Sequence, residues 1–312
     1  MSSFSSLLKD ELVELELNEI EAKAMLKGLL QVNASINISS TGLYLEFKSK
    51  NLKVAQKVYD LILEFYKLEP FMLQTKETKL NKDDVYITRL EQNAYHVLDD
   101  LKVLSAKDDS SYNLKKELLS DEEKLSYLRG AFLACGSIND PKSNTYHLEI
   151  QTFSSFVGFN LRDLMNLYGL NAKISQNRRG YIVYLKSADK ISDFIRILGS
   201  NDELFYFEDC RIEKDLANSI NRVMNCEIAN QKKTLETAKR QLEEIGLVEK
   251  FYGSKLKDSL KEVIMLRRAY PEESLSELET KSTEVLGKNI SKAAINHRLR
   301  EIHDLKEKIS SN

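Results

Sequence analysis

The chain has 312 residues, enough for two or three domains of ordinary size. Hydrophobic residues make up 42% of the sequence and charged residues 30%, a balance typical of a folded globular protein rather than a disordered chain. The net charge is only −2, because 48 acidic residues outnumber 46 Lys and Arg, so any surface that binds nucleic acid must be local. Eleven Gly and three Pro are few helix breakers, which favours long helices and excludes low-complexity architecture.

The sequence disfavours a membrane protein, a secreted protein and a metalloprotein. No apolar run reaches the roughly 18 residues that a membrane-spanning helix needs, and residues 1–23 are acidic and lack the regions of a signal peptide. Cys135, Cys210 and Cys226 are odd in number and form no CxxC pair, which argues against a disulfide framework or a zinc site. No His has a second His four residues later to chelate a metal. We therefore expect a cytoplasmic protein with free thiols and with no metal ion or cofactor.

An internal repeat covers the first two thirds of the sequence. The stretch LKGLLQVNASIN at Leu26–Asn37 aligns with LRGAFLACGSIN at Leu128–Asn139, at an offset of 128 − 26 = 102 residues. Further on, Tyr86–Leu104 resembles Tyr181–Gly199, at an offset of 181 − 86 = 95 residues. The nearly equal offsets indicate two copies of one structural unit that differ by a short insertion.

Each copy shows the same succession of hydrophobic patterns. A helix that contains a Gly is followed by the alternation typical of a strand, as in Leu43–Lys48, and then by a middle helix, two short strands and a closing helix. We therefore predict an α+β fold with two αββαββα units in pseudo-twofold tandem. The expected parts are a first repeat at 1–106, a polar connector at 107–120 and a second repeat at 121–200, with middle helices at 52–68 and 155–170 and strand pairs at 71–76 with 85–90 and 172–177 with 181–186.

Gly28 and Gly130 occupy the same position of the repeat, each inside an apolar helix. Glycine within a helix costs about 1 kcal/mol relative to alanine. A physical reason to accept that cost twice is close backbone contact between the two helices at a pseudo-twofold axis, and we predict such a crossing. The alternative is that both are helical glycines without a packing role.

The two glycine-containing helices resemble the paired LAGLIDADG helices of single-chain homing endonucleases. In that family the last acidic residues of the paired helices place divalent metal ions at the scissile phosphates. Aligned residue by residue, those acidic positions fall on Asn33 and Cys135, and the earlier Asp of the motif falls on Gln31 and Leu133. Metal-dependent cleavage of a phosphodiester needs carboxylates to hold hard cations. We therefore predict a nuclease fold with no catalytic residue and no metal, in which Asn33 and Cys135 are the degenerate positions.

The sequence after residue 200 is predicted to be entirely helical. Segment 201–253 shows no strand pattern and is predicted to be a linker of two helices. Residues 254–312 are predicted to form a DNA-binding domain, with a helix-turn-helix within Ser274–Lys308. The expected boundaries are a first helix at Asp258–Ala269, a second helix opened by a capping box from Ser274 to Glu277, and a turn within Lys281–Ile290.

The final helix carries the residues best suited to read DNA. Ser291 is its predicted N-cap, and Ile290 with Ile295 matches a hydrophobic staple. The face opposite its apolar stripe presents Asn and Arg, which read adenine and guanine in the major groove. Between Lys288 and Lys308, six cations outnumber three acids, which suits phosphate binding; the alternative is an ordinary three-helix domain with a mixed-charge surface. The predicted DNA-binding residues are Lys288, Ser291, Lys292, Ala293, Asn296, His297, Arg298 and Arg300.

The order of these parts resembles that of the bacterial WhiA family, as do the stretches NRVMNCEIANQKKT from Asn221 and SKAAINHRLREI from Ser291. Members of that family join a degenerate LAGLIDADG module to a C-terminal helix-turn-helix similar to region four of sigma factors. The resemblance implies a sequence-specific DNA-binding transcription regulator. It also implies a role in sporulation in filamentous bacteria, or in cell division and chromosome segregation in other Gram-positive bacteria.

The sequence leaves two other functions open, an endonuclease that uses carboxylates at non-standard positions and a cell-division scaffold for which DNA is incidental. We expect double-stranded DNA as a partner, besides another transcription or division protein. We also expect a cytoplasmic, nucleoid-associated monomer without membrane contact, because the predicted two-fold axis is internal. A second, weaker DNA contact is expected on the exposed strands, where Glu46 and Glu149 dilute the positive charge. Its candidate residues are Lys48, Lys76, Arg89, Lys173, Arg178, Arg179 and Lys186.

Overall fold

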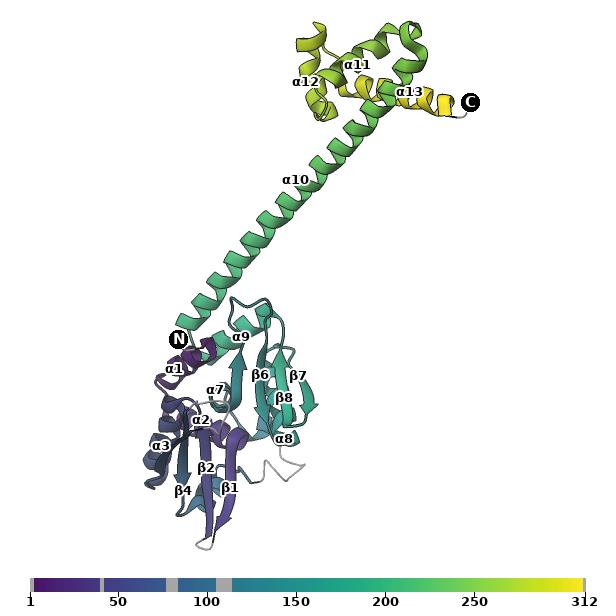
Figure 1. The fold of residues 1–312 in the computed structure, drawn as a ribbon. Coiled ribbons are helices and arrows are strands. Elements are labelled where there is room, and N and C mark those ends of the chain that lie inside the picture. The colour runs from purple at the N-terminus through teal and green to yellow at the C-terminus, as the bar shows by residue number, and fades with distance from the viewer. Residues whose placement is uncertain (1–2, 40–41, 77–83, 105–113, 311–312) are drawn as a thin grey trace. The chain divides into compact units, whose positions relative to one another are not determined.

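The computed structural model describes residues 3–39, 42–76, 84–104 and 114–310 (Figure 1). The chain forms two compact units, Met1–Glu213 and Lys214–Asn312, of which the first is α+β and the second is helical. Of the expected connector, residues 107–113 lie outside the described residues, and the remainder includes the short helix α6 (Leu114–Glu117). Within the described ranges, no helix combines the length and the apolarity needed to cross a membrane.

The first unit contains the two predicted repeats, each with the element order αββαββα. The first repeat consists of α2 (Glu19–Asn33), β1 (Ala34–Ser39), β2 (Gly42–Ser49), α3 (Leu52–Tyr66), β3 (Phe71–Lys76), β4 (Asp84–Leu90) and α4 (Ala94–Asp100). The second consists of α7 (Asp121–Cys135), β5 (Gly136–Ile138), β6 (Leu148–Thr152), α8 (Ser155–Leu167), β7 (Lys173–Asn177), β8 (Gly180–Leu185) and α9 (Ala188–Leu198). Each repeat forms an antiparallel four-stranded sheet, in the orders β1-β2-β4-β3 and β5-β6-β8-β7. The predicted α+β tandem fold is confirmed.

The repeat extends to the side chains that start the helices. Asn18 and Ser120 are the N-caps of α2 and α7, and in each case a Glu three residues further on completes a capping box. Asn51 and Ser154 start α3 and α8 in the same way, each accepting a hydrogen bond from the backbone N–H three residues later. Equivalent caps therefore fix equivalent starting points for the helices of both copies.

Helices α2 and α7 contact each other backbone to backbone at Gly28 and Gly130, as predicted. A Cβ atom built on Gly28 would lie 2.3 Å from the carbonyl oxygen of Tyr127. A Cβ atom built on Gly130 would lie 2.1 Å from the carbonyl oxygen of Met25. Neither distance leaves room for a side chain, so the two glycines set how closely the repeats approach. The apolar residues around the crossing belong to one buried core shared by both repeats.

An N-terminal helix that the sequence analysis did not predict, α1 (Phe4–Val13), packs on the same core. Its apolar face is buried through Phe4, Leu8 and Leu12. Its first residues follow the N-cap Ser3, whose side chain accepts a hydrogen bond from the backbone N–H of Ser6. The acidic character of this segment hid the three apolar positions at helical spacing.

Glu11 of α1 caps a second helix, α10 (Asp202–Tyr252). Its Oε1 accepts hydrogen bonds from the backbone N–H groups of Asn201, at 2.7 Å, and Asp202, at 3.1 Å. Burial would raise the pKa of Glu11, but these bonds and the bond from the Ser200 hydroxyl outweigh burial and lower the pKa. A carboxylate at a helix N-terminus also stabilises the helix dipole. Glu11 thereby fixes the start of α10 on the first unit.

Segment 202–252 is one continuous helix, where the sequence analysis predicted two. It contains no Pro and a single glycine, Gly246, which costs only about 1 kcal/mol and does not end a helix. Residues 215–233 of α10 are exposed, whereas Ile245 and Val248 are buried in the second unit. The core of that unit therefore begins before residue 254, the expected start of the DNA-binding domain.

The second unit consists of the C-terminal part of α10 followed by three helices. These are α11 (Asp258–Ala269), α12 (Leu275–Leu286) and α13 (Lys292–Ser310), after a 3-10 turn at Gly253–Lys255. Helix α12 continues to Leu286, so the prediction of a turn from Lys281 onward is wrong for residues 281–286. Gly287, at φ 67°, ends the helix in the left-handed region that glycine adopts without strain. The buried residues of the unit include Leu260, Val263, Leu278, Ile290, Ile295, Leu299 and Ile302.

We expect Gly130→Ala to lower the free energy of unfolding of the first unit by about 3 kcal/mol or more, because the new methyl group meets a backbone carbonyl that cannot rotate away. Gly246→Ala is the matched control, since it makes the same change in a helix where the added Cβ meets nothing within 4 Å. That variant should be as stable as the parent or about 0.5–1 kcal/mol more stable. Denaturant unfolding of both variants measures the difference. Equal effects would contradict the crossing.

Candidate nucleic-acid interface

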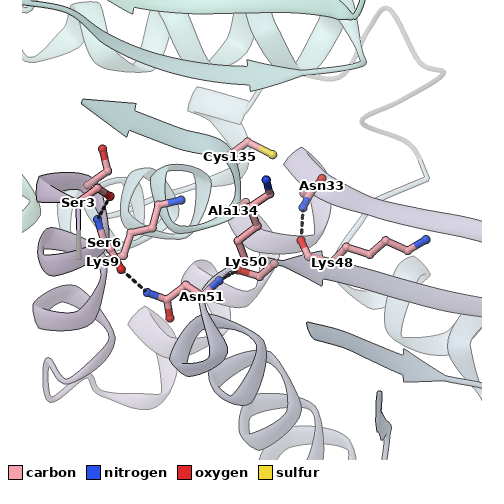
Figure 2. A pocket seen from close by; sticks show the side chains of 11 residues that line it. Ser3, Ser6, Lys9, Asn33, Lys48, Lys50, Asn51, Ala134 and Cys135 are labelled. Carbon is pink, nitrogen blue, oxygen red and sulfur yellow. Dashed lines mark hydrogen bonds between the residues drawn. The ribbon is translucent and has the colours of Figure 1, made fainter. Parts of the chain in front are cut away.

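The ends of the paired helices line a pocket of about 590 Å³ in the first unit (Figure 2). Asn33 is the last residue of α2 and Cys135 the last residue of α7, so the crossing at the glycines brings the two degenerate positions into one pocket. The start of α1 and the segment between β2 and α3 complete its wall. The remaining lining residues are Ser3, Ser5, Ser6, Lys9, Lys48, Ser49, Lys50, Asn51 and Ala134.

The chemistry of this pocket does not fit a divalent cation. The side-chain amide of Asn33 is turned toward the backbone, donating from Nδ2 to the Lys48 carbonyl oxygen at 2.8 Å. Burial raises the pKa of the Cys135 thiol to about 11, so it is protonated at neutral pH, whereas a metal ligand must be a thiolate. Among its described lining residues there is no Asp or Glu. The part of the chain that the structure describes also holds no group of three or more His, Cys, Asp and Glu suited to a metal.

Lys9 brings a positive charge to this place instead. Its Nζ lies 5.7 Å from the centroid of the Phe132 ring, and no described residue gives it a hydrogen bond or an ion pair. Burial lowers the pKa of Lys9 to about 8, although the nearby Cys135 acts in the opposite direction. At neutral pH Lys9 is therefore a half-buried charged group with no counter-ion among the described residues.

A second pocket lies at the equivalent place of the other repeat, and its described lining residues carry no charge. It is lined by Gln31, Val32, Ala34, Thr152, Phe153, Ser154, Ser155 and Tyr181. Ser154 and Asn51 are equivalent N-caps, so Phe153 takes the position that Lys50 has in the first pocket. Among the described residues, the positive charge at the helix ends therefore belongs to one of the two pockets.

The cations predicted on the exposed strands are only partly free. Lys48 lies 3.2 Å from Glu46, and the Nε of Arg89 donates to the same carboxylate at 2.9 Å. Glu46 thus pairs with two of the cations predicted on the first sheet, and it reduces the positive charge there more than the sequence pattern indicated. The remaining candidates are exposed, and they are Lys76, Lys173, Arg178, Arg179 and Lys186.

In the second unit, α13 has the two faces that the sequence predicted. Ile295, Leu299 and Ile302 are buried against the core, and the Ser291 Oγ accepts a hydrogen bond from the Ala294 backbone N–H as the predicted N-cap. The opposite face is exposed at Lys292, Ala293, His297 and Arg300 and half-exposed at Asn296. Within the described residues, Lys292 and Arg300 have no ion-pair partner. This face is free to contact a ligand.

Two of the predicted DNA-binding cations are held by an acid. Glu262 on α11 accepts from Lys288 Nζ at 2.6 Å and from Arg298 Nη1 at 3.2 Å. These ion pairs lower the pKa of Glu262, so it is charged at neutral pH. Lys288 and Arg298 thus tie α13 and its turn to α11. Lys292 and Arg300, by contrast, have no such partner in the part of the chain that the structure describes. The local excess of positive charge is smaller than the sequence count.

A buried hydroxyl fixes the turn that precedes α13. Ser282, on α12, accepts a hydrogen bond from the backbone N–H of Ile290 at 2.9 Å and donates to the Glu279 carbonyl oxygen at 2.7 Å. Ile290 directly precedes the N-cap of α13 and is buried in the core. The Ser282 hydroxyl therefore sets the position at which α13 leaves the turn.

Comparisons with known proteins agree with this architecture. The WhiA N-terminal LAGLIDADG-like domain matches residues 19–104, the WhiA LAGLIDADG-like domain matches residues 124–217, and the WhiA C-terminal HTH domain matches residues 220–306. A "Probable cell division protein WhiA" of Bacillus thuringiensis (strain Al Hakam) is 42% identical over 315 residues, which cover 99% of this chain and 97% of that protein. The chain belongs to the WhiA family.

Solved structures of WhiA proteins share its fold. The full-length DUF199/WhiA from Thermatoga maritima has a TM-score of 0.60 and 22% identity, over 98% of this chain and 99% of that one. The N-terminal LAGLIDADG domain of DUF199/WhiA has a TM-score of 0.51 and 20% identity, over 64% of this chain and 92% of that one. The WhiA matches place a LAGLIDADG-like module before a helix-turn-helix. Helix α1, with Lys9, precedes the first matched residue.

Sequence analysis missed three residues of these sites. Lys9 gives no signal in the sequence, because the acidic composition of the N-terminus obscures the helical pattern of its segment. Glu262 lies far along the chain from the cations it neutralises, and a count of charges within one helix does not reveal it. Ser282 is a small polar residue within an expected turn, and its burial is a tertiary property with no local signal.

We expect Ser282→Ala to destabilise the second unit by about 1–3 kcal/mol, because the Ile290 N–H loses its partner in a buried place. Ser276→Ala, on the exposed side of the same helix, is the control and should change stability by less than about 0.5 kcal/mol. Denaturant unfolding checks both values, and hydrogen exchange at the Ile290 amide should become faster only in Ser282→Ala.

We expect Lys9→Met to stabilise the first unit at pH 7 by about 1–3 kcal/mol. The Lys9 pKa is about 8 in the folded protein and near its ordinary value when unfolded, so the charged form opposes folding below pH 8. The unfolded chain holds more protons between these values, so the penalty fades as pH rises and the advantage of Lys9→Met shrinks. Cys135, with its raised pKa, has the opposite pH dependence but is present in both proteins. Unfolding at pH 7 and pH 10 tests this, and a destabilised Lys9→Met at pH 7 contradicts it.

Proposed function

We propose that this WhiA-family protein is a sequence-specific DNA-binding transcription regulator in which α13 reads bases. The observation that carries the proposal is the solvent-facing side of α13, opposite its buried face. There Asn296 and Arg300 lie on the same helix as Lys292, which has no ion-pair partner among the described residues. Asn and Arg on such a helix match adenine and guanine in the major groove, and a lysine near the helix start suits a phosphate. The family match to an HTH domain over residues 220–306 supports this assignment.

We assign the regulator to cell division and chromosome segregation, or to sporulation in a filamentous host. The name of the Bacillus relative, a probable cell division protein, supports the first of these roles. Double-stranded DNA is the proposed partner, together with another transcription or division protein, and the proposed state is a cytoplasmic monomer at the nucleoid. Mapping genomic sites by crosslinking and sequencing gives the operator for the binding tests below.

We further propose that the LAGLIDADG-like module does not cleave DNA. The proposal rests on the amide and the protonated thiol at the two helix ends and on the cationic wall that faces them. Incubation of the protein with Mg²⁺ and plasmid should give a gel shift without nicking. Specific cleavage that EDTA abolishes would instead show an endonuclease with carboxylates at other positions.

We expect Asn296→Ala and Arg300→Ala each to weaken operator binding by about 1–3 kcal/mol and to relax the preference at one base pair. The reason is that each side chain supplies a bidentate contact to one base and little to the backbone. Fluorescence anisotropy with the operator and with single-base variants measures both effects. Equal losses on operator and random DNA would contradict base reading, and unaltered operator binding and cellular function in both variants would favour the scaffold alternative.

We expect Lys292→Ala to weaken binding to all sequences alike and to reduce the slope of log affinity against log salt by about 0.9. An exposed lysine in the last turn of the same helix, Lys308, provides a control with the same change of charge. Lys308→Ala should leave both affinity and slope nearly unchanged. The same response from both variants would show a diffuse charge effect rather than a phosphate contact at the start of α13.

A further inference from the structure

The pocket at the ends of α2 and α7 has the composition of an anion site. Its described lining combines lysines, hydroxyls and amides, without a carboxylate. The lysines come from two separate elements, Lys9 from α1 and Lys50 from the segment before α3. Figure 2 shows both side chains directed toward the part of the pocket near Cys135, whereas Lys48 extends away along its strand.

Lys9 is the member of this cluster that points to a ligand. Burial leaves its ammonium poorly solvated, and among the described residues it has no counter-ion. A buried charge without a partner opposes folding, as its lowered pKa indicates. An apolar side chain would fill the same place beside Phe132 without that penalty. A lysine at this place fits a site in which a bound anion supplies the counter-ion.

Two further features of the pocket favour an anion over a neutral ligand. The N-terminal end of α1 borders it, with Ser5 and Lys9 one helical turn apart on the same side. The positive end of a helix and its first N–H groups favour negative charge. The described lining of the equivalent pocket in the second repeat contains no lysine and has Phe153 where this one has Lys50. As far as the chain is described, the cationic lining is therefore specific to one of the two pockets.

The nearby acids that the structure describes do not pair with Lys9. Asp10 accepts a hydrogen bond from Asn51 Nδ2 at 2.6 Å and is not among the lining residues. Glu46 is engaged by Lys48 and Arg89 on the sheet. Lys9 thus remains the charged group that faces the pocket without an internal partner among the described residues.

We propose that this pocket binds a phosphate group, with Lys9 as its principal counter-ion and with Lys50 and the Ser6 hydroxyl of α1 as further donors. Phosphate fits because it offers several strong acceptor oxygens to donors that converge from different sides. The phosphate belongs either to the backbone of DNA held by the first unit or to a free phosphate compound. The first source rests on the proposed DNA-binding function, whereas the second does not.

The test compares the full-length protein with Lys9→Met and with Lys57→Met, a lysine on α3 that is also partly buried and lies outside the pocket. Inorganic phosphate is titrated at constant ionic strength, with binding followed by calorimetry and by the melting temperature. We expect phosphate to bind the parent and Lys57→Met and to bind Lys9→Met at least about tenfold more weakly. Because Lys9→Met is expected to be the more stable protein, loss of binding would not reflect unfolding.

Binding of a random-sequence duplex then separates the two sources. If the phosphate is that of DNA, Lys9→Met lowers duplex affinity and the salt slope by about 0.9, while Lys57→Met does not. If the phosphate is free, Lys9→Met loses inorganic phosphate but keeps duplex affinity. Phosphate binding that is unaltered by Lys9→Met, or equally weakened by both variants, overturns the proposal. A parent that binds phosphate but no duplex would instead count against the proposed function alone.

Discussion

The approach of two backbones at Gly28 and Gly130 is the constraint on which the first unit depends. Because a Cβ at either position would lie 2.3 Å or less from a carbonyl oxygen, the repeats meet at a fixed separation and angle. That contact carries the last residues of α2 and α7, Asn33 and Cys135, into the wall of one pocket. The same packing that holds the LAGLIDADG-like fold together therefore also places these two residues side by side.

Much of the fold follows from the sequence, because it depends on local patterns that occur twice. The repeat offset, the paired glycines and the alternation around Leu45 predicted the tandem units and their strands. The capping box at Ser274 and the apolar stripe of α13 likewise predicted the helices of the second unit. Boundaries were weaker where no residue stops a helix, since 202–252 runs through Gly246 without a break.

The sites were less predictable, because their properties arise between elements. Lys9 lines the pocket only because α1 packs next to the ends of the paired helices, and that packing cannot be read from the sequence. Arg298 looked like a DNA contact within its own helix, yet Glu262 of another helix engages it together with Lys288. Charge patterns along the chain identify candidate residues, whereas the partner that neutralises each charge is known only once the helices are packed. That the exposed face of α13 contacts DNA bases stays a prediction.

The two pockets at the helix ends differ in the charge of their described lining residues, so the two halves of the first unit are not equivalent. Its halves are alike in backbone, but one ends in Lys9 and Lys50 and the other in Phe153 and uncharged groups. A half turn about the internal axis thus exchanges a pocket lined by lysines for one whose described lining is uncharged. The two orientations of an elongated polyanion laid across both pockets are therefore not equivalent, even though the two repeats share one fold.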